Sequence, residues 1–270
     1  MMLNFITSPQ NQRVKDLVKL REHRQRAKQG RILIDGSREL LRALAGGIDI
    51  EQAYVCESLC QSRESQELLV ELANAGVDVW HVTPEVFEKM SYGDRAEGVL
   101  AVAATPRRTL ASLPMKDDPL VAVIEGVEKP GNVGAVLRSA DAVGVDAVIV
   151  ADGGTDLFNP NAIRASLGTI FTVPVCAAST DQTIAWLRER KFRVYAARVR
   201  GAVDYTEADY RGAAAIVLGS EADGLSIAWQ AEDVIGVQLP ILGVADSLNV
   251  SATAAVLFYE ALRQRRASGL

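Results

Sequence analysis

Three short segments in the C-terminal half of the chain combine polar residues with glycine, and each directly follows a hydrophobic run. They span residues 130–138, 218–224 and 239–251. In open α/β sheets, ligand sites form in the loops that follow the carboxyl ends of strands. We therefore expect the three segments to meet in one composite site.

The first segment predicts a helix that begins near Asn132. Apolar residues recur at helical spacing along it, and Gly144 is a suitable C-terminal cap. Asn132 and Gly134 lie at its start, where spare backbone N–H groups suit an anion or a polar substrate, and Arg138 falls on the side away from the core. Taken alone, a capped helix with a solvated arginine is the simpler explanation.

The second segment follows the apolar run 214–218. Its glycines, Gly219 and Gly224, would let the backbone approach a ligand closely, and Glu221 is a hydrogen-bond acceptor at the strand end. An ordinary turn with a carboxylate that caps the next helix explains the same residues.

The third segment is the most unusual. Pro240 ends a strand, Gly243 permits a sharp loop, and Ser247 and Asn249 stand on either side of Leu248 at the start of a helix. One polar side chain is enough for a helix cap. Two polar side chains on either side of an apolar residue indicate a binding site for a ligand with both polar and apolar parts.

The elements around these segments predict two domains of α/β class. The first half alternates short strands (31–35, 52–55, 77–82 and 98–103) with helical patterns at 37–45 and 65–75. The second half contains apolar runs without alternation, typical of parallel strands covered on both faces, at 120–124, 147–151, 193–197, 214–218 and 234–239. Prolines and charges between them indicate a linker at 105–119, with domains at 1–104 and 120–270.

Composition excludes several classes of protein. A hydrophobic content of 49% is that of a folded chain, and no apolar run approaches the roughly 20 residues of a membrane span. The N-terminus is polar rather than signal-like, so we expect a cytoplasmic protein. Cys56, Cys60 and Cys176, with only His23 and His81, do not form a recognisable metal-ligand set, and we interpret the cysteines as reduced thiols.

Charge is uneven along the chain. The whole carries a formal charge of −5, but residues 11–31 hold eight basic residues against two acidic ones, Asp16 and Glu22. Such a run is either a solvated helix face or a surface for a polyanion.

In this order, the motifs resemble those of one family. Asn132-x-Gly134-x-x-x-Arg138, Gly219-x-Glu221-x-x-Gly224 and the segment from Leu239-Pro240 to Ser247-Leu248-Asn249-Val250-Ser251 resemble the three signatures of the SpoU-type RNA ribose 2′-O-methyltransferases of the SPOUT superfamily. The resemblance spans about 120–265 and includes Arg164-Ala165-Ser166-Leu167-Gly168, and the N-terminal half resembles the substrate-binding domain of many members.

The resemblance implies a C-terminal parallel-sheet SPOUT domain with a trefoil knot, S-adenosylmethionine as cofactor, no metal, and a homodimer. It implies RNA as substrate, with ribosomal RNA favoured over transfer RNA. The cofactor would contact Leu218, Gly219, Leu239, Ile241, Gly243, Leu248 and Asn249. The catalytic group would be Asn132, Arg138, Glu221, Ser247 and Asn249. We expect RNA to contact Arg13, Arg21, Arg24, Arg26 and Arg164.

The implied reaction is in-line transfer of a methyl group from a sulfonium to a ribose 2′-hydroxyl. Alignment of the reacting atoms and removal of the hydroxyl proton would lower its barrier. Arg138 is essential in this scheme, but a guanidinium is a poor base, so the proton acceptor is left open between an RNA phosphate and a water that Arg138 positions.

Two other readings stay open at this point. The strand, glycine loop and helix at 124–143 imitate a dinucleotide site, but Gly126, Gly131 and Gly134 do not make G-x-G-x-x-G. A noncatalytic RNA-binding module could keep the same fold, although the intact polar residues of the motifs argue against it.

Overall fold

The computed structural model describes residues 4–92, 97–199 and 202–267. Its contacts divide the chain into two compact units: Met1–Pro106 with Phe158–Thr172, and Arg107–Leu157 with Val173–Leu270. Residues 158–172 therefore pack with the first unit, whereas the sequence assigned all of 120–270 to the second domain.

The first unit contains a five-stranded mixed sheet in the order β1-β4-β3-β5-β2. The neighbours of β4 run parallel to it, and β5 is antiparallel to both of its neighbours. The strands are β1 (Asn4–Ile6), β2 (Arg31–Asp35), β3 (Ile50–Val55), β4 (Asp78–Val82) and β5 (Val99–Ala104). The helices are α1 (Gln12–Lys19), α2 (His23–Gln29), α3 (Ser37–Ala45), α4 (Arg63–Asn74), α5 (Pro84–Met90), α7 (Pro160–Ala165) and α8 (Thr169–Thr172), with a 3₁₀ turn η1 (Glu57–Leu59).

The second unit contains a seven-stranded sheet in the order β10-β12-β9-β11-β6-β7-β8, in which every pair is parallel. The strands are β6 (Leu120–Glu125), β7 (Ala147–Ala151), β8 (Val175–Ala178), β9 (Arg193–Ala197), β10 (Val203–Asp204), β11 (Ala214–Leu218) and β12 (Val234–Gln238). The helices are α6 (Pro130–Val143), α9 (Thr180–Glu189) and α10 (Val250–Ala267), with 3₁₀ turns η2 (Leu110–Ser112) and η3 (Ile227–Gln230).

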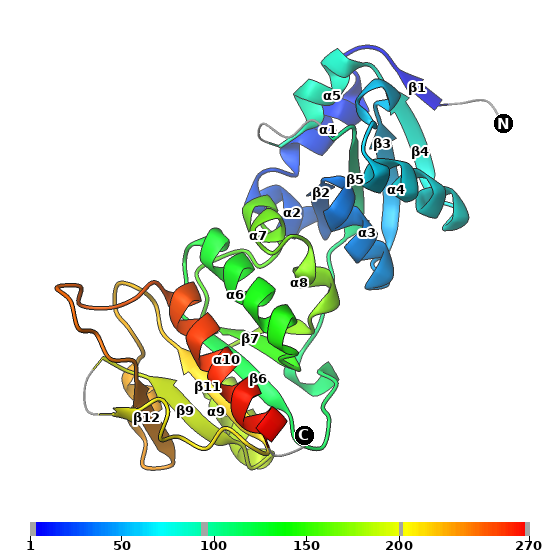
Figure 1. Ribbon diagram of the computed structural model, residues 1–270. Helices are drawn as coiled ribbons and strands as arrows, with labels where there is room; N and C mark the ends of the chain where they lie inside the picture. Colours follow the sequence, from blue (N-terminus) through cyan, green and yellow to red (C-terminus); the bar gives the residue numbers. More distant parts are fainter. Residues whose placement is uncertain (1–3, 93–96, 200–201, 268–270) are drawn as a thin grey trace. The chain divides into compact units, whose positions relative to one another are not determined.

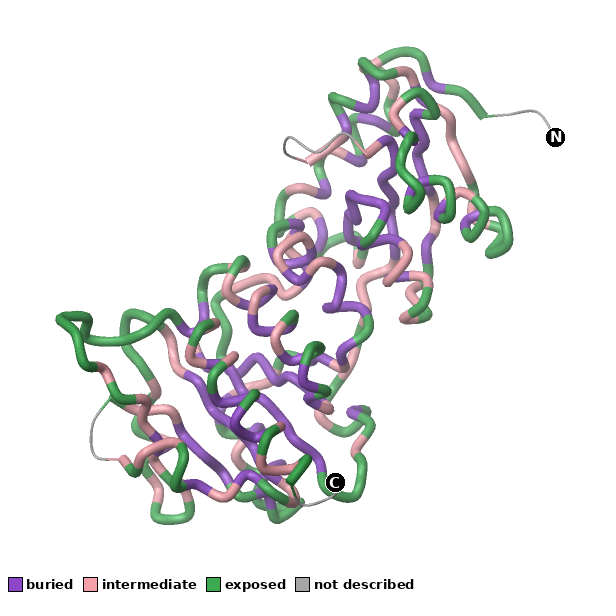
Figure 2. Tube along the Cα trace, viewed as in Figure 1, coloured by how far each residue is buried: buried purple, intermediate pink, exposed green. Residues whose placement is uncertain are grey.

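Helices cover both faces of this sheet, which explains its unbroken apolar strands. The α6 and α10 helices pack against each other over one face (Figure 1). On the other face, Trp186 of α9 and Trp229 of η3 join alternate residues of the strands in one core cluster. In Figure 2 the central strands β6, β7 and β11 are buried along their whole length, whereas the edge strand β10 and its neighbour β12 are partly exposed.

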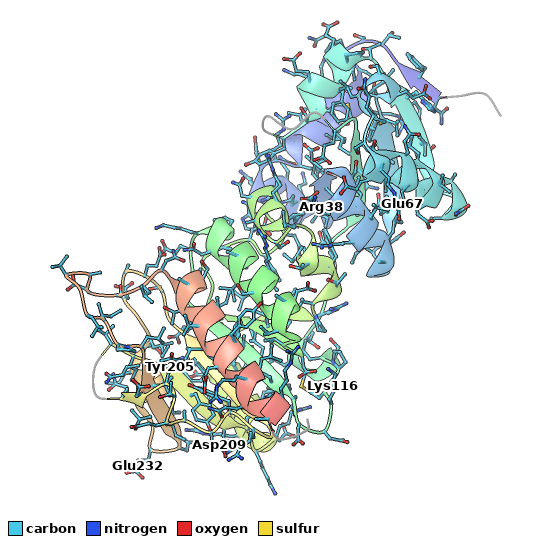
Figure 3. All side chains as sticks on the ribbon, viewed as in Figure 1. Arg38, Glu67, Lys116, Tyr205, Asp209 and Glu232 are labelled. Carbon is cyan, nitrogen blue, oxygen red and sulfur yellow. The ribbon has the colours of Figure 1, made fainter. Side chains whose placement is uncertain are left out.

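The linker prediction needs a refinement. Residues 107–119 belong to the second unit, and Leu113 is buried in its core. Lys116, labelled in Figure 3, forms an ion pair of 2.8 Å with Asp146. This stretch is therefore an integral edge of the second unit.

The α/β class and the parallel second sheet are confirmed, and each strand named from the sequence is present to within about two residues. Gly144 caps α6 in the left-handed conformation, with φ of 75°. The short strands β1, β8 and β10 were not predicted. The trefoil knot stays a prediction. Among the described residues, no helix combines the length and apolar character needed to cross a membrane.

Candidate functional site

The three motifs converge because they follow strands that are parallel neighbours or near neighbours. The first follows β6, the second follows β11, and the third follows β12. In the sheet, β11 pairs with β6 and with β9, and β9 pairs with β12. Their carboxyl ends thus lie at one edge, which is where the sequence places the ligand site.

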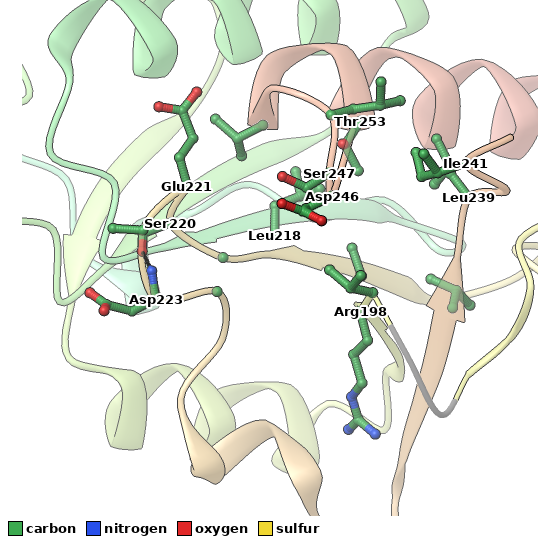
Figure 4. A pocket seen from close by; sticks show the side chains of 18 residues that line it. Arg198, Leu218, Ser220, Glu221, Asp223, Leu239, Ile241, Asp246, Ser247 and Thr253 are labelled. Atoms are coloured by element: carbon green, nitrogen blue, oxygen red, sulfur yellow. Dashed lines mark hydrogen bonds between the residues drawn. The ribbon is translucent and has the colours of Figure 1, made fainter. Parts of the chain in front are cut away.

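A cavity of about 360 Å³ opens at this edge, within the range of small-molecule sites. It is lined by Ala197, Arg198, Val199, Leu218, Gly219, Ser220, Glu221, Ala222, Asp223, Gly224, Val237, Leu239, Ile241, Asp246, Ser247, Leu248, Val250 and Thr253. Figure 4 shows Ser247, Asp246 and Thr253 gathered above Leu218, with Leu239 and Ile241 beside them. The lining therefore mixes apolar walls with polar groups.

Most of the predicted cofactor contacts line this cavity: Leu218, Gly219, Leu239, Ile241 and Leu248. The structure does not bring Gly243 or Asn249 to its lining. A Cβ on Gly243 would meet open space, and its φ is not in the left-handed region. No contact with the described part of the chain therefore requires glycine at position 243.

Gly219 is required for loop closure rather than only for the approach of a ligand. Ser220 and Gly224 exchange two backbone hydrogen bonds of 3.1 Å, which folds the loop back on itself. A Cβ on Gly219 would overlap the backbone carbonyl of Gly224. The loop that walls the cavity can close only with glycine there.

A smaller cavity of about 110 Å³ lies beside the first and shares the wall formed by 220–223 and Val250. Its other wall is the start of α6 with Lys129 and Asn132. The predicted catalytic residue Glu221 therefore lines both cavities, and Asn132 lines the smaller one.

Asn249 ties the three motifs together. Its amide nitrogen donates to Glu221 and, over 3.4 Å, to Asn132 Oδ1. Its Oδ1 accepts from the backbone N–H of Ser251 at 2.9 Å and from the Ser251 hydroxyl at 2.6 Å, which caps α10. One side chain thus fixes the start of α10 and also positions Glu221.

Glu221 is held as an ionised acceptor. Lys129 Nζ donates to its Oε2 at 2.8 Å, and this hydrogen bond is the main reason that the pKa of Glu221 is lowered. Hydrogen bonds from Asn132 and Asn249 act in the same direction. A carboxylate with a lowered pKa is a weaker base, so this geometry suits hydrogen bonding and charge more than proton removal.

Arg138 stands apart from both cavities. It is exposed on α6, six residues after Asn132, and it is not among the lining residues of either cavity. Ser247, which was predicted to belong to the catalytic group, lines the larger cavity. Within one chain, three of the five predicted catalytic residues therefore line the cavities, Asn249 is hydrogen-bonded to two of these three, and Arg138 faces solvent.

Several residues at the site were not singled out from the sequence. Lys129 precedes the first motif, and its partner Glu221 lies 92 residues later, so only the fold brings them together. Asp223 and Asp246 add acidic groups to the larger cavity, which favours a ligand with positive charge. For Asp223 and Asp246, the only signal in the sequence was that they lie inside the second and third motif segments.

Arg26 was predicted to contact RNA, and the structure corrects this. Its side chain is 3% exposed and its Nη1 donates to the carbonyls of Leu20 and Arg21, each at 2.7 Å. These carbonyls end α1, so Arg26 caps that helix from within the fold.

Two further arginines of the RNA prediction hold backbone groups. Arg21 donates to the carbonyls of Lys89 and Ser91 at the end of α5. Arg164 donates to the Tyr92 carbonyl at 2.7 Å. Arg13 and Arg24 are exposed, and the Arg13 guanidinium lies 4.1 Å from the centre of the Trp80 ring. The basic surface is therefore smaller than its sequence suggested.

The bifunctional role of Asn249 allows the two functions to be separated. Asn249→Asp keeps the oxygen that caps α10 but removes the donor to Glu221, so we expect a melting temperature near that of the wild type and kcat lower by about 100-fold. Asn249→Ala should lose both, with an added cost of about 1 kcal/mol in unfolding free energy. Thermal melts measure the effect on stability, and single-turnover rates measure the effect on catalysis. A normal rate in Asn249→Asp would show that catalysis does not require the hydrogen bond from Asn249 to Glu221.

Comparisons with known proteins identify both halves. Residues 119–259 match the SpoU rRNA Methylase family, and residues 11–101 match the MRM3-like substrate binding domain. The motif resemblance and the domain resemblance noted in the sequence are both confirmed.

The similar proteins act on RNA. The chain is 28% identical over 254 residues, 94% of this chain and 97% of the relative, to a 23S rRNA (guanosine(2553)-2′-O)-methyltransferase, RlmP, of Bacillus subtilis strain 168. It is 31% identical over 237 residues, 83% of this chain and 95% of the relative, to a 23S rRNA (guanosine-2′-O-)-methyltransferase, RlmB, of Xylella fastidiosa strain 9a5c.

Solved structures agree over nearly the whole chain. An RNA 2′-O ribose methyltransferase superposes with a TM-score of 0.84 at 43% identity, covering 96% of this chain and 98% of the other. The SpoU methyltransferase AviRb from Streptomyces viridochromogenes, solved in complex with AdoMet, superposes with a TM-score of 0.84 at 26% identity, covering 97% of this chain and 100% of the other.

Proposed function

Because the chain belongs to the SpoU rRNA Methylase family, we propose that it transfers a methyl group from S-adenosylmethionine to a ribose 2′-hydroxyl of ribosomal RNA. The observation that carries this proposal is the convergence of the three motifs. The second and third motifs line the larger cavity, whose apolar walls and acidic groups suit a sulfonium and an ammonium group, and the first and second motifs line the smaller cavity beside it.

Residues of both cavities have distinct parts in the proposed reaction. The bound cofactor supplies an activated methyl group. Leu218, Leu239 and Leu248 give the apolar walls that hold and orient it. The neighbouring group of Glu221, Asn249 and Asn132 offers hydrogen-bonding atoms to a ribose that enters the smaller cavity. Alignment of two bound partners supplies much of the rate.

Ribosomal RNA is favoured over transfer RNA as the substrate. The relatives that cover most of this chain are named for 23S rRNA, and the match to a substrate-binding domain covers 11–101. Transfer of labelled methyl groups from S-adenosylmethionine to purified ribosomal or transfer RNA tests this choice: label in ribosomal RNA supports it, and label in transfer RNA alone contradicts it.

We place RNA contacts on the exposed basic residues of α1 and α2. Arg24 and Lys28 are four residues apart and exposed on one face of α2. Replacing both with glutamate should weaken RNA binding and reduce the slope of log K against log salt by about 2, because two phosphate contacts are lost. Fluorescence anisotropy at several salt concentrations measures both effects.

Arg63 provides the matched control. It is exposed at the start of α4 in the same unit, and Arg63→Glu makes the same single charge reversal as Arg24→Glu, with which it is compared, on a different helix. An equal loss of RNA affinity in the control would mean that general charge, rather than this surface, attracts RNA. Arg26 is unsuitable for such a test because it is buried.

We also propose that the protein works as a cytoplasmic homodimer through the second unit. Helix α10 exposes Val256 and Tyr259, and α6, which packs against α10, carries the exposed Arg138 between the small residues Ala135 and Ala142 in the sequence. Exposed apolar groups beside small residues favour helix packing by a second copy, which would also give Arg138 a partner surface. Sedimentation analysis tests the dimer.

The cysteines are free and buried, as suits a reducing compartment.

A further inference from the structure

A buried carboxylate, that of Glu125, lies next to the site at the end of β6. Glu125 is the last residue of β6 and is 6% exposed. Its Oε1 accepts from the hydroxyls of Thr180 and Ser226, at 2.7 and 2.9 Å, and from the indole N–H of Trp229 at 2.9 Å. Its Oε2 accepts from the backbone N–H of Ser226 at 2.7 Å. Four donors on one buried carboxylate make a strong and specific anchor.

This anchor fixes the far end of the loop that walls both cavities. The loop leaves β11 at Leu218, which pairs with Ile124 in the sheet. It returns to Ser226, which bonds to Glu125, the next residue of β6. Residues 219–225 therefore span between two points that are attached to consecutive residues of one buried strand.

A second hydrogen bond, from Arg198, fixes the turn η3 that follows the loop. The Arg198 guanidinium donates to the Trp229 carbonyl, so the backbone of η3 is bound on one side while its indole is bound by Glu125 on another. In Figure 4 the Arg198 guanidinium points away from Ser247 and Asp246, in keeping with this structural bond. The end of the loop is thus held by two charged groups.

We propose that Glu125 is a positioning residue for methyl transfer: by anchoring Ser226 it sets the loop 219–225, and with it both the cofactor wall and Glu221. The inference rests on the proposed function, because it assigns the cofactor to the larger cavity. Among the described residues that line the two cavities, Glu125 itself is absent, although the next residue, Gly126, lines the smaller one; Glu125 reaches the cofactor wall through the loop.

The hydrogen bonds supply a matched set of variants. Glu125→Gln keeps the shape of the side chain but replaces one carboxylate oxygen with an NH₂ group, which is a donor. That NH₂ group then faces either the backbone N–H of Ser226 or the donors that bond to Oε1. Ser226→Ala removes a hydroxyl from the loop side of Glu125. Thr180→Val removes a hydroxyl that bonds the same oxygen from α9, which lines neither cavity. Each single deletion removes one hydroxyl from Glu125 Oε1; the bond from Ser226 is partly buried and the bond from Thr180 is fully buried.

The test measures cofactor affinity by calorimetry, loop protection by amide hydrogen exchange, and melting temperature for all four proteins. We expect Glu125→Gln to weaken S-adenosylmethionine binding about tenfold, Ser226→Ala to weaken it in the same direction, and both to speed exchange at 219–225. Thr180→Val, whose bond is the more buried of the two, should lower the melting temperature at least as much as Ser226→Ala yet bind the cofactor normally.

Two results would overturn the inference. One is normal cofactor affinity and loop exchange in a folded Glu125→Gln protein; the other, which applies even if that variant does not fold, is equal cofactor affinity in Ser226→Ala and Thr180→Val. A wild-type protein that fails to bind S-adenosylmethionine would instead refute the proposed function, so the two failures are distinguishable.

Discussion

Gly219→Ala should abolish cofactor binding while the second unit stays folded. The added Cβ would overlap the carbonyl of Gly224, so the hydrogen bonds between Ser220 and Gly224 cannot form as they do now. The loop would have to open, and Glu221 and Asp223, which line the larger cavity, would move with it. We expect the Kd for S-adenosylmethionine, measured by calorimetry, to rise by at least about 100-fold, which corresponds to roughly 2.7 kcal/mol.

Gly131→Ala is the control for this change. A Cβ at Gly131 meets no atom within 4 Å, and the residue lies in the first turn of α6 outside both cavity linings. The control should bind the cofactor normally and melt no earlier, because alanine favours a helix over glycine. Native affinity in a folded Gly219→Ala protein would show that the closed loop is not part of the cofactor site.

Arg138→Ala should have the opposite signature: cofactor binding kept and methyl transfer lost. Arg138 is exposed and lines neither cavity, so its removal leaves the lining intact. A guanidinium directed at RNA can orient a phosphate or a water that accepts the hydroxyl proton and can stabilise developing charge. We expect single-turnover rates to fall by about 10³-fold, with the Kd for S-adenosylmethionine unchanged.

Two further variants make the Arg138 result specific. Arg138→Lys keeps the charge but loses the planar fork, so a large loss there would indicate that geometry matters beyond charge. Arg266→Ala removes an exposed arginine from the end of α10 and should leave the rate unchanged. Near-normal turnover in Arg138→Ala would remove Arg138 from the catalytic group.

The site was largely predictable because its signals are local. Apolar runs at β6, β11 and β12 each end in a polar, glycine-rich segment, and parallel pairing of such strands brings their ends to one edge. The role of Gly219 was only partly foreseen. Its need for glycine comes from contact with Gly224 five residues later, which depends on how the loop closes.

What could not be predicted depends on contacts between distant residues. Arg26 carries the same charge as its neighbours in sequence, and only the packing of α2 against the end of α1 turns it inward. Likewise, the pairs of Lys129 with Glu221 and of Glu125 with Ser226 join residues about 100 positions apart. Residues 158–172 belong to the first unit although the chain on either side of them belongs to the second. Gly168 packs closely on α3 there, because a Cβ on Gly168 would come within 2.9 Å of Glu39 Cα.

The central claim is that the three motifs form one site that methylates ribose. Its most direct measurement is mass spectrometry of nucleosides from ribosomal RNA that lacks this modification, after incubation with the protein and S-adenosylmethionine. The account predicts a new nucleoside whose added methyl group stays with the ribose fragment and which is absent with Arg138→Ala. A methyl group on the base, or none with protein that binds the cofactor, would contradict it.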